Sequence, residues 1–200
     1  MSTNRPKYHH GNLRKTLIST SLELIAEVGL EGFSVAKVAK QAGVSSGAPY
    51  RHFTDRESIL VATAVVYLTE LTSRMRIAVN AAGKNPTDRL ASTAGAYVQY
   101  AIEYNVGFEL FAVVKGVHSA KLYERSREMI NFLMLVVQEA KPYATWSEIV
   151  ELMEAHLAIS QGFAHMYYQG SFAKIKLTQE ESIERVTTAA QYLINGWMYQ

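Results

Sequence analysis

The sequence contains no cysteine among its 200 residues, which excludes disulfide bonds and any zinc site built on cysteine thiolates. Long apolar runs are also absent. The longest clear aliphatic run, residues 132–137, is far shorter than the roughly 20 residues of a membrane-spanning helix. The first eleven residues, MSTNRPKYHHG, have no apolar core, so they do not resemble a secretory signal. We therefore expect a soluble cytoplasmic protein.

Motifs of catalysis are missing as well. The chain has no Gly-x-Ser-x-Gly nucleophile motif and no glycine-rich phosphate loop. The adjacent carboxylates Glu180 and Glu181 fall in a predicted first helical turn, where the helix dipole favours acidic side chains. No two histidines have the i, i+4 spacing of a helical metal site. We expect a protein that is not an enzyme, with no cofactor and no bound metal.

Proline is scarce, with four residues in the chain, and little of the sequence alternates between apolar and polar residues as strands do. Long segments repeat with a helical period instead. This pattern predicts an all-α fold of nine helices, in which an N-terminal three-helix domain precedes a helical bundle. The predicted helices cover 12–27, 34–42, 46–53, a segment that begins after Asp55, 87–104, 106–116, 119–140, 146–168 and 179–199.

Sequence signals for helix starts support these bounds. Capping boxes, in which the N-cap and N3 side chains satisfy backbone donors reciprocally, occur at Thr145–Glu148 and Thr178–Glu181. Asp55 is the expected N-cap of the fourth helix. The change in character near this point places a DNA-binding domain at 1–56 and a ligand-binding and dimerisation domain at 57–200.

The most informative stretch is Phe33–Phe53, which has the sequence FSVAKVAKQAGVSSGAPYRHF. Ser34 is suited to cap a short helix, and Gly43 follows that helix where a left-handed residue is needed. The spacing Ala39-x-x-x-Gly43-Val44 is typical of a helix-turn-helix, whose second helix enters the major groove of DNA. An ordinary pair of packed helices is the alternative for this pattern taken alone.

Positive charge is concentrated in the same region. Residues 1–54 contain seven lysines and arginines against three glutamates, a net charge of +4, whereas residues 55–200 have a net charge of −2. Contact with DNA phosphates requires such a basic surface. A charged face alone is most often simply solvated. Because this one coincides with the helix-turn-helix pattern, the combination favours DNA binding.

The first predicted helix, the stretch GFSVAKVAKQAGVSSGAPYRHFTDRESIL and six further helices resemble the TetR-type family of bacterial transcriptional repressors. The specific part of the resemblance covers about residues 8–60. The segments YHHGNLR and GAPYRHF resemble the branch of that family with a WHG-type C-terminal domain. Where that branch has Trp-x-x-x-His-Gly, this chain has the sequence LAISQG at 157–162.

The resemblance implies a homodimer that binds a double-stranded DNA operator, with a cavity for a small-molecule effector in the C-terminal bundle. Ligand binding there would shift the helix after Asp55, change the spacing of the two recognition helices and release the DNA. A two-fold dimer presents those helices about 34–36 Å apart, one turn of DNA. The alternative is a DNA-binding regulator or activator without an effector, and a helical carrier or enzyme is more remote.

The resemblance and the local chemistry together give ten candidate DNA contacts: Ser34, Lys37, Ser45, Ser46, Gly47, Ala48, Tyr50, Arg51, His52 and Arg56. In the family, the positions of Ser46–Ala48 form an exposed turn that faces base edges, which would bring the Ala48 methyl against a thymine methyl. Small size that merely avoids clashes is the alternative. Ser34, Lys37 and Arg56 are expected to contact backbone phosphates.

The second half of this segment carries the larger candidates. Tyr50 and His52 match family positions for phosphate or base contact, and Arg51 is suited to a guanine edge or a phosphate. A solvated charge is the alternative for Arg51. Pro49 has no N–H for the cap carbonyl, so the first turn of the recognition helix should be irregular. Further positive groups precede it in the N-terminal segment: Arg5, Lys7, His10 and Arg14.

The last predicted helix carries the dimerisation signal. Its apolar residues recur at spacings of 3, 4, 3 and 4, the pattern of a helix–helix seam: Ile183, Val186, Ala190, Leu193 and Trp197. A second stripe lies on the helix at 146–168: Ile149, Leu152, Met153, His156, Leu157 and Ser160. Two helices from each subunit would then form a four-helix interface. The alternative is that both stripes face the core of their own chain.

The effector site is harder to locate. Candidate ligand contacts are the aromatic residues and histidines of the C-terminal region: Tyr97, Tyr100, Tyr104, Phe108, Phe111, His118, His156 and His165. Ligand sites in helical bundles form between helices, from apolar walls and a few polar groups. Aromatic stripes at helical spacing are more often core, and each histidine has a structural role as its alternative.

Overall fold

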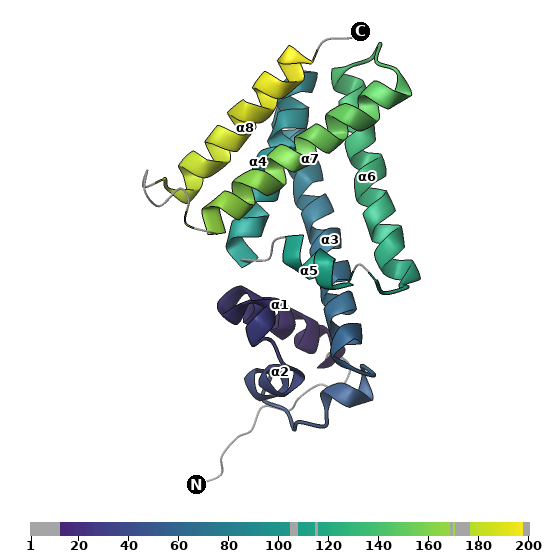
Figure 1. The fold of residues 1–200 in the computed structure, drawn as a ribbon, viewed down its shortest axis with the longest axis vertical. Helices are drawn as coiled ribbons and strands as arrows, with labels where there is room; N and C mark the ends of the chain where they lie inside the picture. Colours follow the sequence, from purple (N-terminus) through teal and green to yellow (C-terminus); the bar gives the residue numbers. More distant parts are fainter. Residues whose placement is uncertain (1–12, 105–107, 115, 169, 171–176, 198–200) are drawn as a thin grey trace.

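The computed structural model describes residues 13–104, 108–114, 116–168, 170 and 177–197. Within them the chain forms eight α-helices, one 3₁₀ helix and no strand (Figure 1). The helices are α1 (Leu13–Gly32), α2 (Val35–Gln41), η1 (Pro49–Arg51), α3 (Arg56–Ala81), α4 (Pro86–Tyr104), α5 (Phe108–Val114), α6 (Ala120–Ala140), α7 (Trp146–Tyr168) and α8 (Gln179–Gly196). The all-α prediction is confirmed. The count of nine α-helices is not, because residues 46–53 form turns and η1.

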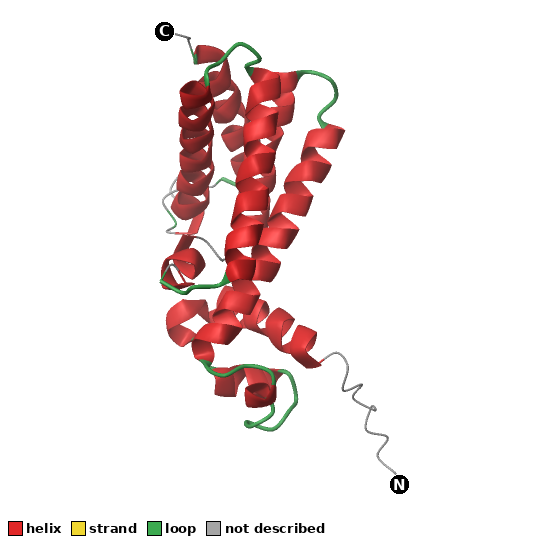
Figure 2. Ribbon diagram, turned by 90° about the vertical axis from the view of Figure 1, so that its right-hand side faces the viewer, coloured by secondary structure: helices red, strands yellow, loops and turns green. Residues whose placement is uncertain are grey.

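One long helix, α3, joins two regions of different size (Figures 1 and 2). Its first turns lie with α1, α2 and η1 at one end of the molecule, and we call residues 13–56 the head. The rest of α3 packs against α4 and α6, while α7 and α8 pack on α4, and we call these helices with α5 the bundle. The short α5 packs against α3 at the end of the bundle that faces the head.

Capping side chains begin these helices where the sequence predicts them. The Asp55 carboxylate caps α3. A reciprocal capping box forms between Thr178 and Glu181 at α8, and the Thr145 N–H donates to Glu148 Oε2 over 2.6 Å at α7. Such bonds satisfy backbone N–H groups that every helix start leaves without an intrahelical partner.

The first helix is interrupted near its end. Gly29 has a φ of +69°, outside the helical region, and one further turn continues to Gly32. The sequence prediction ends the helix before this glycine, which is where the backbone does leave the helical path. The extra turn directs Leu30 and Phe33 into the core of the head, where both are buried.

The buried side chains of the head are continuous with the core of the bundle. Leu17 and Ile25 of α1, Val38 of α2 and Phe53 after η1 are buried together, and Ile59 from the start of α3 joins them. Because α3 continues from this core into the bundle, a displacement of α3 changes the position of the head.

The bundle is built around α4, which contacts α3, α6, α7 and α8. Small residues allow close approach: a Cβ on Gly95 would lie 2.7 Å from the Thr187 Oγ1 of α8. Tyr67 of α3 and Tyr100 of α4 are fully buried, with ring centroids 4.6 Å apart. Among the described helices, none is both long enough and apolar enough to cross a membrane.

Candidate functional site

The turn between α2 and the next segment has the geometry of a helix-turn-helix. Gly43 has a φ of +69°, its N–H donates to the Lys40 carbonyl, and the Val44 N–H donates to the Ala39 carbonyl over 3.0 Å. This pair of bonds is the Schellman motif, which closes a helix and turns the chain away. The Ser34 hydroxyl accepts from the Lys37 N–H at the other end of α2. The turn predicted from the sequence is therefore confirmed.

The segment after the turn departs from the predicted recognition helix over 46–53. The Ala48 N–H donates to Ser45, the His52 N–H donates to Pro49, and residues 49–51 form η1. Pro49 has no N–H to continue an α-helical ladder back to the Ser45 carbonyl, so the chain takes tighter turns. The predicted irregularity at Pro49 is confirmed, and it extends to the whole segment. Ser45 caps no helix here, since η1 has no side-chain cap.

Most of the candidate DNA contacts in this segment face outward. Ser45, Ser46, Gly47, Arg51 and His52 are exposed, as is the Tyr50 side chain, which is 57% accessible. These residues form the tip of the head. A Cβ on Gly47 would meet nothing within 4 Å, so the backbone here is open to close approach.

Ala48 is an exception, and its predicted exposure is wrong. The residue is only 8% accessible, and its neighbour Pro49 is also buried. The tight turns before η1 direct the Ala48 methyl toward the protein instead of outward, away from a thymine methyl. An α-helix over 46–53 would have been needed to present it.

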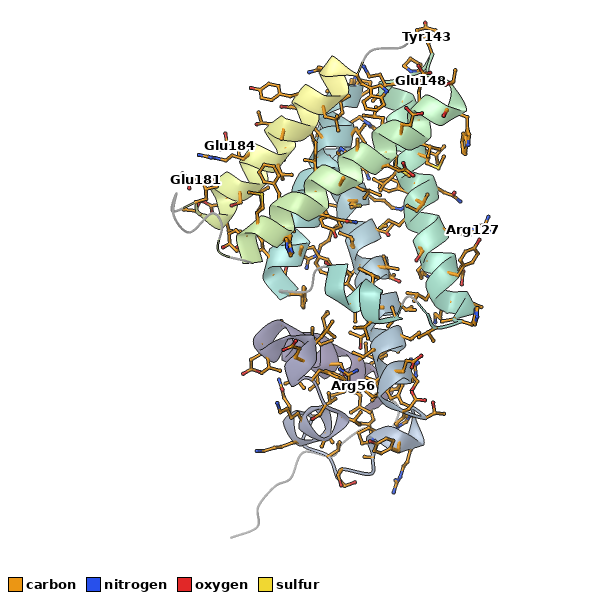
Figure 3. All side chains as sticks on the ribbon, viewed as in Figure 1. Arg56, Arg127, Tyr143, Glu148, Glu181 and Glu184 are labelled. Carbon is orange, nitrogen blue, oxygen red and sulfur yellow. The ribbon has the colours of Figure 1, made fainter. Side chains whose placement is uncertain are left out.

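Lys37 and Arg56 make contacts within the head that the sequence analysis missed. The Lys37 Nζ donates to the Gly32 carbonyl over 2.8 Å, and the Arg56 Nη2 donates to the Leu30 carbonyl over 3.0 Å. The Arg56 guanidinium also lies over the Phe33 ring, 5.4 Å from its centroid (Figure 3). Both cations thereby hold the end of α1. No local pattern could reveal the Arg56 contact, because its partner lies 26 residues earlier.

Arg14 has a related position in the head. Its guanidinium lies 5.0 Å from the centroid of the Phe53 ring, so α1 and the segment after η1 are held together by a cation–π contact. The other members of the basic N-terminal segment, Arg5, Lys7 and His10, lie outside the described residues.

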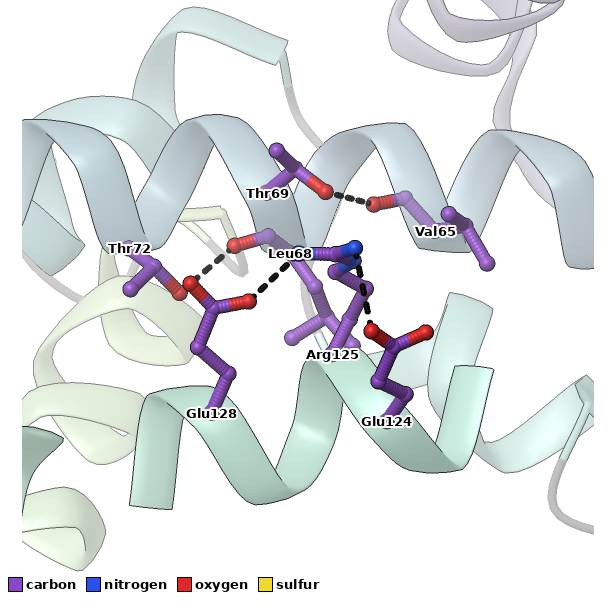
Figure 4. A network of polar contacts seen from close by, with 7 residues as sticks. All are labelled: Val65, Leu68, Thr69, Thr72, Glu124, Arg125 and Glu128. Atoms are coloured by element: carbon purple, nitrogen blue, oxygen red, sulfur yellow. Dashed lines mark hydrogen bonds and ion pairs between the residues drawn. The ribbon is translucent and has the colours of Figure 1, made fainter. Parts of the chain in front are cut away.

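Charges in the head and the bundle are arranged differently. Every ion pair between described side chains lies in the bundle: Arg74 with Glu70 and Glu103, Arg89 with Glu139, and Arg125 with Glu124 and Glu128. Figure 4 shows Arg125 between its two carboxylates, beside α3. The lysines and arginines described in the head have no such partner. They present positive charge that is available to phosphates.

Several candidate ligand residues form an aromatic cluster in the bundle core. The Tyr100 ring stacks near Tyr67 and meets the Tyr104 ring at 5.0 Å, while Phe111 of α5 packs edge-on against Tyr67 at 5.7 Å. Burial raises the pKa of the Tyr97 hydroxyl to about 12. Their contacts are those of core residues, and the cluster joins α3, α4 and α5.

Phe111 also lines an open groove of about 620 Å³ between α5 and the start of α6. His118 lies in the same groove, so the structure brings these two candidates together. The remaining lining residues are Val114, Val117, Ser119, Ala120, Leu122, Tyr123 and Ser126. Phe108 begins α5, and its side chain is outside the described set.

The two histidines of α7 differ in environment. His156 is 1% accessible, and its Nε2 lies 2.8 Å from the Thr93 Oγ1 of α4. Burial lowers the pKa of its imidazole to about 4, so the ring is neutral at physiological pH. His165 is exposed and lines none of the bundle interior.

The seam predicted for dimerisation is turned largely inward. Val186 and Ala190 are fully buried within the chain, on the side of α8 that packs against α4. Their assignment to a dimer interface is therefore wrong for this conformation. Ile183, Leu193 and Trp197 are half-buried at the edge of the same contact. Heptad-like spacing identifies a buried stripe, but it does not distinguish a partner chain from the chain's own α4.

The second stripe behaves in the same way. Ile149, Leu152, Met153 and Ser160 of α7 are buried in the core of their own chain. The outer surface of these two helices instead carries exposed apolar side chains such as Met166 and Tyr192.

Comparisons with known proteins agree with this geometry. Residues 17–63 match the family described as “Bacterial regulatory proteins, tetR family”, and they span α1, α2, η1 and the start of α3. YerO of Bacillus subtilis (strain 168), an uncharacterised helix-turn-helix-type transcriptional regulator, is 31% identical over 84 residues, which cover 42% of this chain and 29% of that protein. The match thus spans less than a third of the relative's length.

Solved structures extend the likeness to the bundle. A transcriptional regulator from Rhodococcus sp. Rha1 has a TM-score of 0.71 and 22% identity, covering 92% of this chain and 96% of that one. A TetR variant from Acinetobacter baumannii AYE, in complex with minocycline, has a TM-score of 0.61 and 18% identity, covering 95% and 96%. At these identities the likeness shows the fold.

The head and bundle thus define a helix-turn-helix protein with an all-helical C-terminal region. Its N-terminal part, residues 17–63, matches the TetR family of bacterial regulatory proteins, and the described chain as a whole has the fold of a solved transcriptional regulator.

Proposed function

We propose that this protein binds a double-stranded DNA operator through the tip of its head and represses transcription there. The main support for this proposal is that Tyr50, Arg51 and His52 are exposed on the head. The described cations of the head also lack carboxylate partners. Arg51 provides a planar fork for a guanine edge or a phosphate. The open backbone at Gly47 allows the turn to approach the duplex closely.

The DNA-binding protein is a homodimer in this proposal. Residues 1–56 bind DNA, and residues 57–200 dimerise and bind an effector. The exposed outer faces of α7 and α8, with Met166 and Tyr192, supply the apolar surface for the partner. A two-fold pair then presents its two heads to consecutive major grooves.

The effector is a small molecule bound in the bundle, and its binding releases the operator. Support comes from α3, which is continuous from the head core at Ile59 to the bundle core at Tyr67. A ligand that moves the bundle helices packed on α3 therefore changes the spacing of the two heads. The A. baumannii protein of the same fold was solved in complex with minocycline, which supports the proposal by analogy.

A gel-shift experiment with DNA from upstream of the protein's own gene tests the DNA-binding role. The double variant Tyr50→Ala/Arg51→Ala should lose affinity by about 100-fold, because two exposed contacts are removed. The matched control, Tyr123→Ala/Arg127→Ala, removes an exposed tyrosine and an exposed arginine from α6 and should bind like the wild type. Undiminished specific binding by the first variant would contradict the proposed reading surface. Binding that no metabolite alters would identify a regulator without an effector.

A further inference from the structure

The α4–α7 interface contains a histidine whose hydrogen bonds fix its tautomer. The Thr93 hydroxyl donates its single hydrogen to the Leu90 carbonyl over 2.7 Å. It must therefore accept a hydrogen from the His156 Nε2, 2.8 Å away. A neutral imidazole with a hydrogen on Nε2 carries a lone pair on Nδ1. The Nδ1 atom of His156 is thus a hydrogen-bond acceptor.

This acceptor is buried and has no partner. His156 is 1% accessible, and no donor of the described residues reaches its Nδ1. Since burial holds the pKa near 4, protonation does not relieve the unsatisfied atom at physiological pH. Buried polar atoms without partners are rare in folded proteins, and each is a candidate position for a missing ligand or water.

A second buried polar atom without a partner belongs to Arg89 of α4. Arg89 precedes Thr93 by four residues, which places both on the same side of the helix, one turn apart. The Arg89 Nη2 pairs with Glu139 over 3.0 Å, but its Nε is buried and unpaired. Because this guanidinium reaches α6, the unpaired acceptor that lies at the α4–α7 contact itself is the Nδ1 of His156.

The Ser160 hydroxyl, one turn after His156, already donates to the His156 carbonyl over 2.8 Å, and the other buried neighbours along the two helices include apolar side chains. Leu152 and Met153 lie one turn before His156 on α7 and are buried, as are Leu90 and Ala94 beside Thr93 on α4. Methionine is flexible and can change rotamer to make room for a ligand. An ionised ligand would lose its hydration here without a charged partner on Nδ1, so the site favours a neutral molecule.

We propose that the α4–α7 interface binds the hydroxyl group of a small, neutral, mainly apolar molecule, which donates to the Nδ1 of His156. The inference rests on the proposed function, because it names the chemical class of the effector. The open groove at Phe111 and His118 is the competing location, but its polar groups face solvent and need no ligand to satisfy them.

Nitrogen NMR of the wild-type protein labelled with ¹⁵N-histidine tests the proposal directly. The probes are phenol, toluene, which has a similar size but no donor, and benzoate, which carries a charge. Phenol should move the Nδ1 resonance of His156, and toluene should not. A neutral hydrogen bond predicts that phenol binds about three- to tenfold more tightly than toluene, and benzoate more weakly than both.

Two variants make the test specific. His156→Phe should bind phenol and toluene equally, whereas His165→Phe, on the exposed side of the same helix, should keep the preference for phenol. Circular dichroism checks that both variants are folded. If His156→Phe does not fold, the shift of the His156 Nδ1 resonance in the wild type still tests whether phenol binds there. Equal binding of phenol and toluene to the wild type, or phenol shifts confined to His118, would overturn the proposal. Because these measurements use no DNA, a failure of operator binding is seen separately.

Discussion

The head and the bundle differ in their ion pairs: those between described side chains lie in the bundle, although Arg76 and Arg127 of the bundle also lie over aromatic rings. Arg74, Arg89 and Arg125 of the bundle each face one or two carboxylates, whereas the described lysines and arginines of the head face backbone carbonyls, aromatic rings or solvent. Paired charges largely cancel at a distance, but unpaired ones create a positive surface. We therefore expect the positive surface of the head, rather than the paired arginines of the bundle, to attract a polyanion.

The two regions also differ in what holds them together. The bundle has an extensive apolar core around α4, with Leu133 of α6 fully buried within it. The head is shorter, and besides its buried apolar side chains it has polar contacts from Lys37 and Arg56 to the end of α1. Stability and DNA binding should therefore separate when side chains are changed one at a time.

The largest expected effect on stability comes from the bundle core. Leu133→Ala should lower the free energy of unfolding by about 2–5 kcal/mol, since it leaves a cavity in a packed interior. Leu135→Ala, two residues along α6 and 62% exposed, should change it by less than about 0.5 kcal/mol. Urea denaturation measures both. Equal losses would show that α6 does not face the core as described.

Acid should destabilise the bundle through His156. Its folded pKa is about 4 and the ordinary value is 6.5, so between these values the unfolded chain binds a proton that the folded chain does not. Stability should fall as pH decreases through this window, by about 3 kcal/mol at pH 4, and this group should add no pH dependence above about pH 7. Urea denaturation at several pH values in this range should show that the free energy of unfolding changes less steeply with pH in His156→Phe than in the wild type. The same dependence on pH in both proteins would contradict the burial of a neutral imidazole.

Two glycines should change stability in opposite directions when replaced by alanine: Gly95 at the α4–α8 contact and Gly162 on α7. Gly95→Ala should cost about 1–3 kcal/mol, because the new Cβ would lie 2.7 Å from Thr187 Oγ1. Gly162→Ala, in α7 with nothing within 4 Å, should stabilise its helix by about 0.5–1 kcal/mol. Thermal melting records both shifts. A Gly95→Ala protein as stable as the wild type would mean that the two helices lie further apart.

The smallest expected effect on stability comes from replacing Arg56. This variant tests whether Arg56 stabilises the head or instead contacts DNA. Arg56→Ala should reduce the free energy of unfolding by about 1 kcal/mol, through loss of the bond to the Leu30 carbonyl. Hydrogen exchange at the end of α1 should rise with it. Lys40→Ala, an exposed cation on α2, is the control and should leave stability unchanged. A loss of DNA affinity in Arg56→Ala with no change in exchange would instead assign Arg56 to phosphate contact.

Local signals allowed the helices to be placed from sequence. Asp55 and the Thr178–Glu181 box determine helix starts by contacts within four residues, so a single sequence contains the information. The sequence predicts that Pro49 makes the first turn of the recognition helix irregular. Whether the whole segment over 46–53 loses its α-helical form depends on how the turn before Pro49 packs. That packing buries Ala48, which residue type alone does not reveal.

Contacts between residues far apart in the chain could not be predicted from the sequence. His156 and Thr93 are 63 positions apart, and no periodicity relates them. The stripe containing Val186 and Ala190 was correctly seen as apolar, but a stripe that packs on α4 has the same spacing as one that packs on a partner. In both cases the missing information is which surfaces meet.

Affinity for upstream DNA, measured by fluorescence anisotropy as salt is increased, tests the central claim most directly. If the unpaired cations of the head contact phosphates, the logarithm of the binding constant should fall linearly with that of the salt concentration, with a slope of about −0.9 per phosphate contacted. Arg51→Ala should bind more weakly than the wild type at every salt concentration tested. Equal affinity and equal slope for the two proteins, or no binding by the wild type at low salt, would contradict the assignment of the head as the DNA-binding surface.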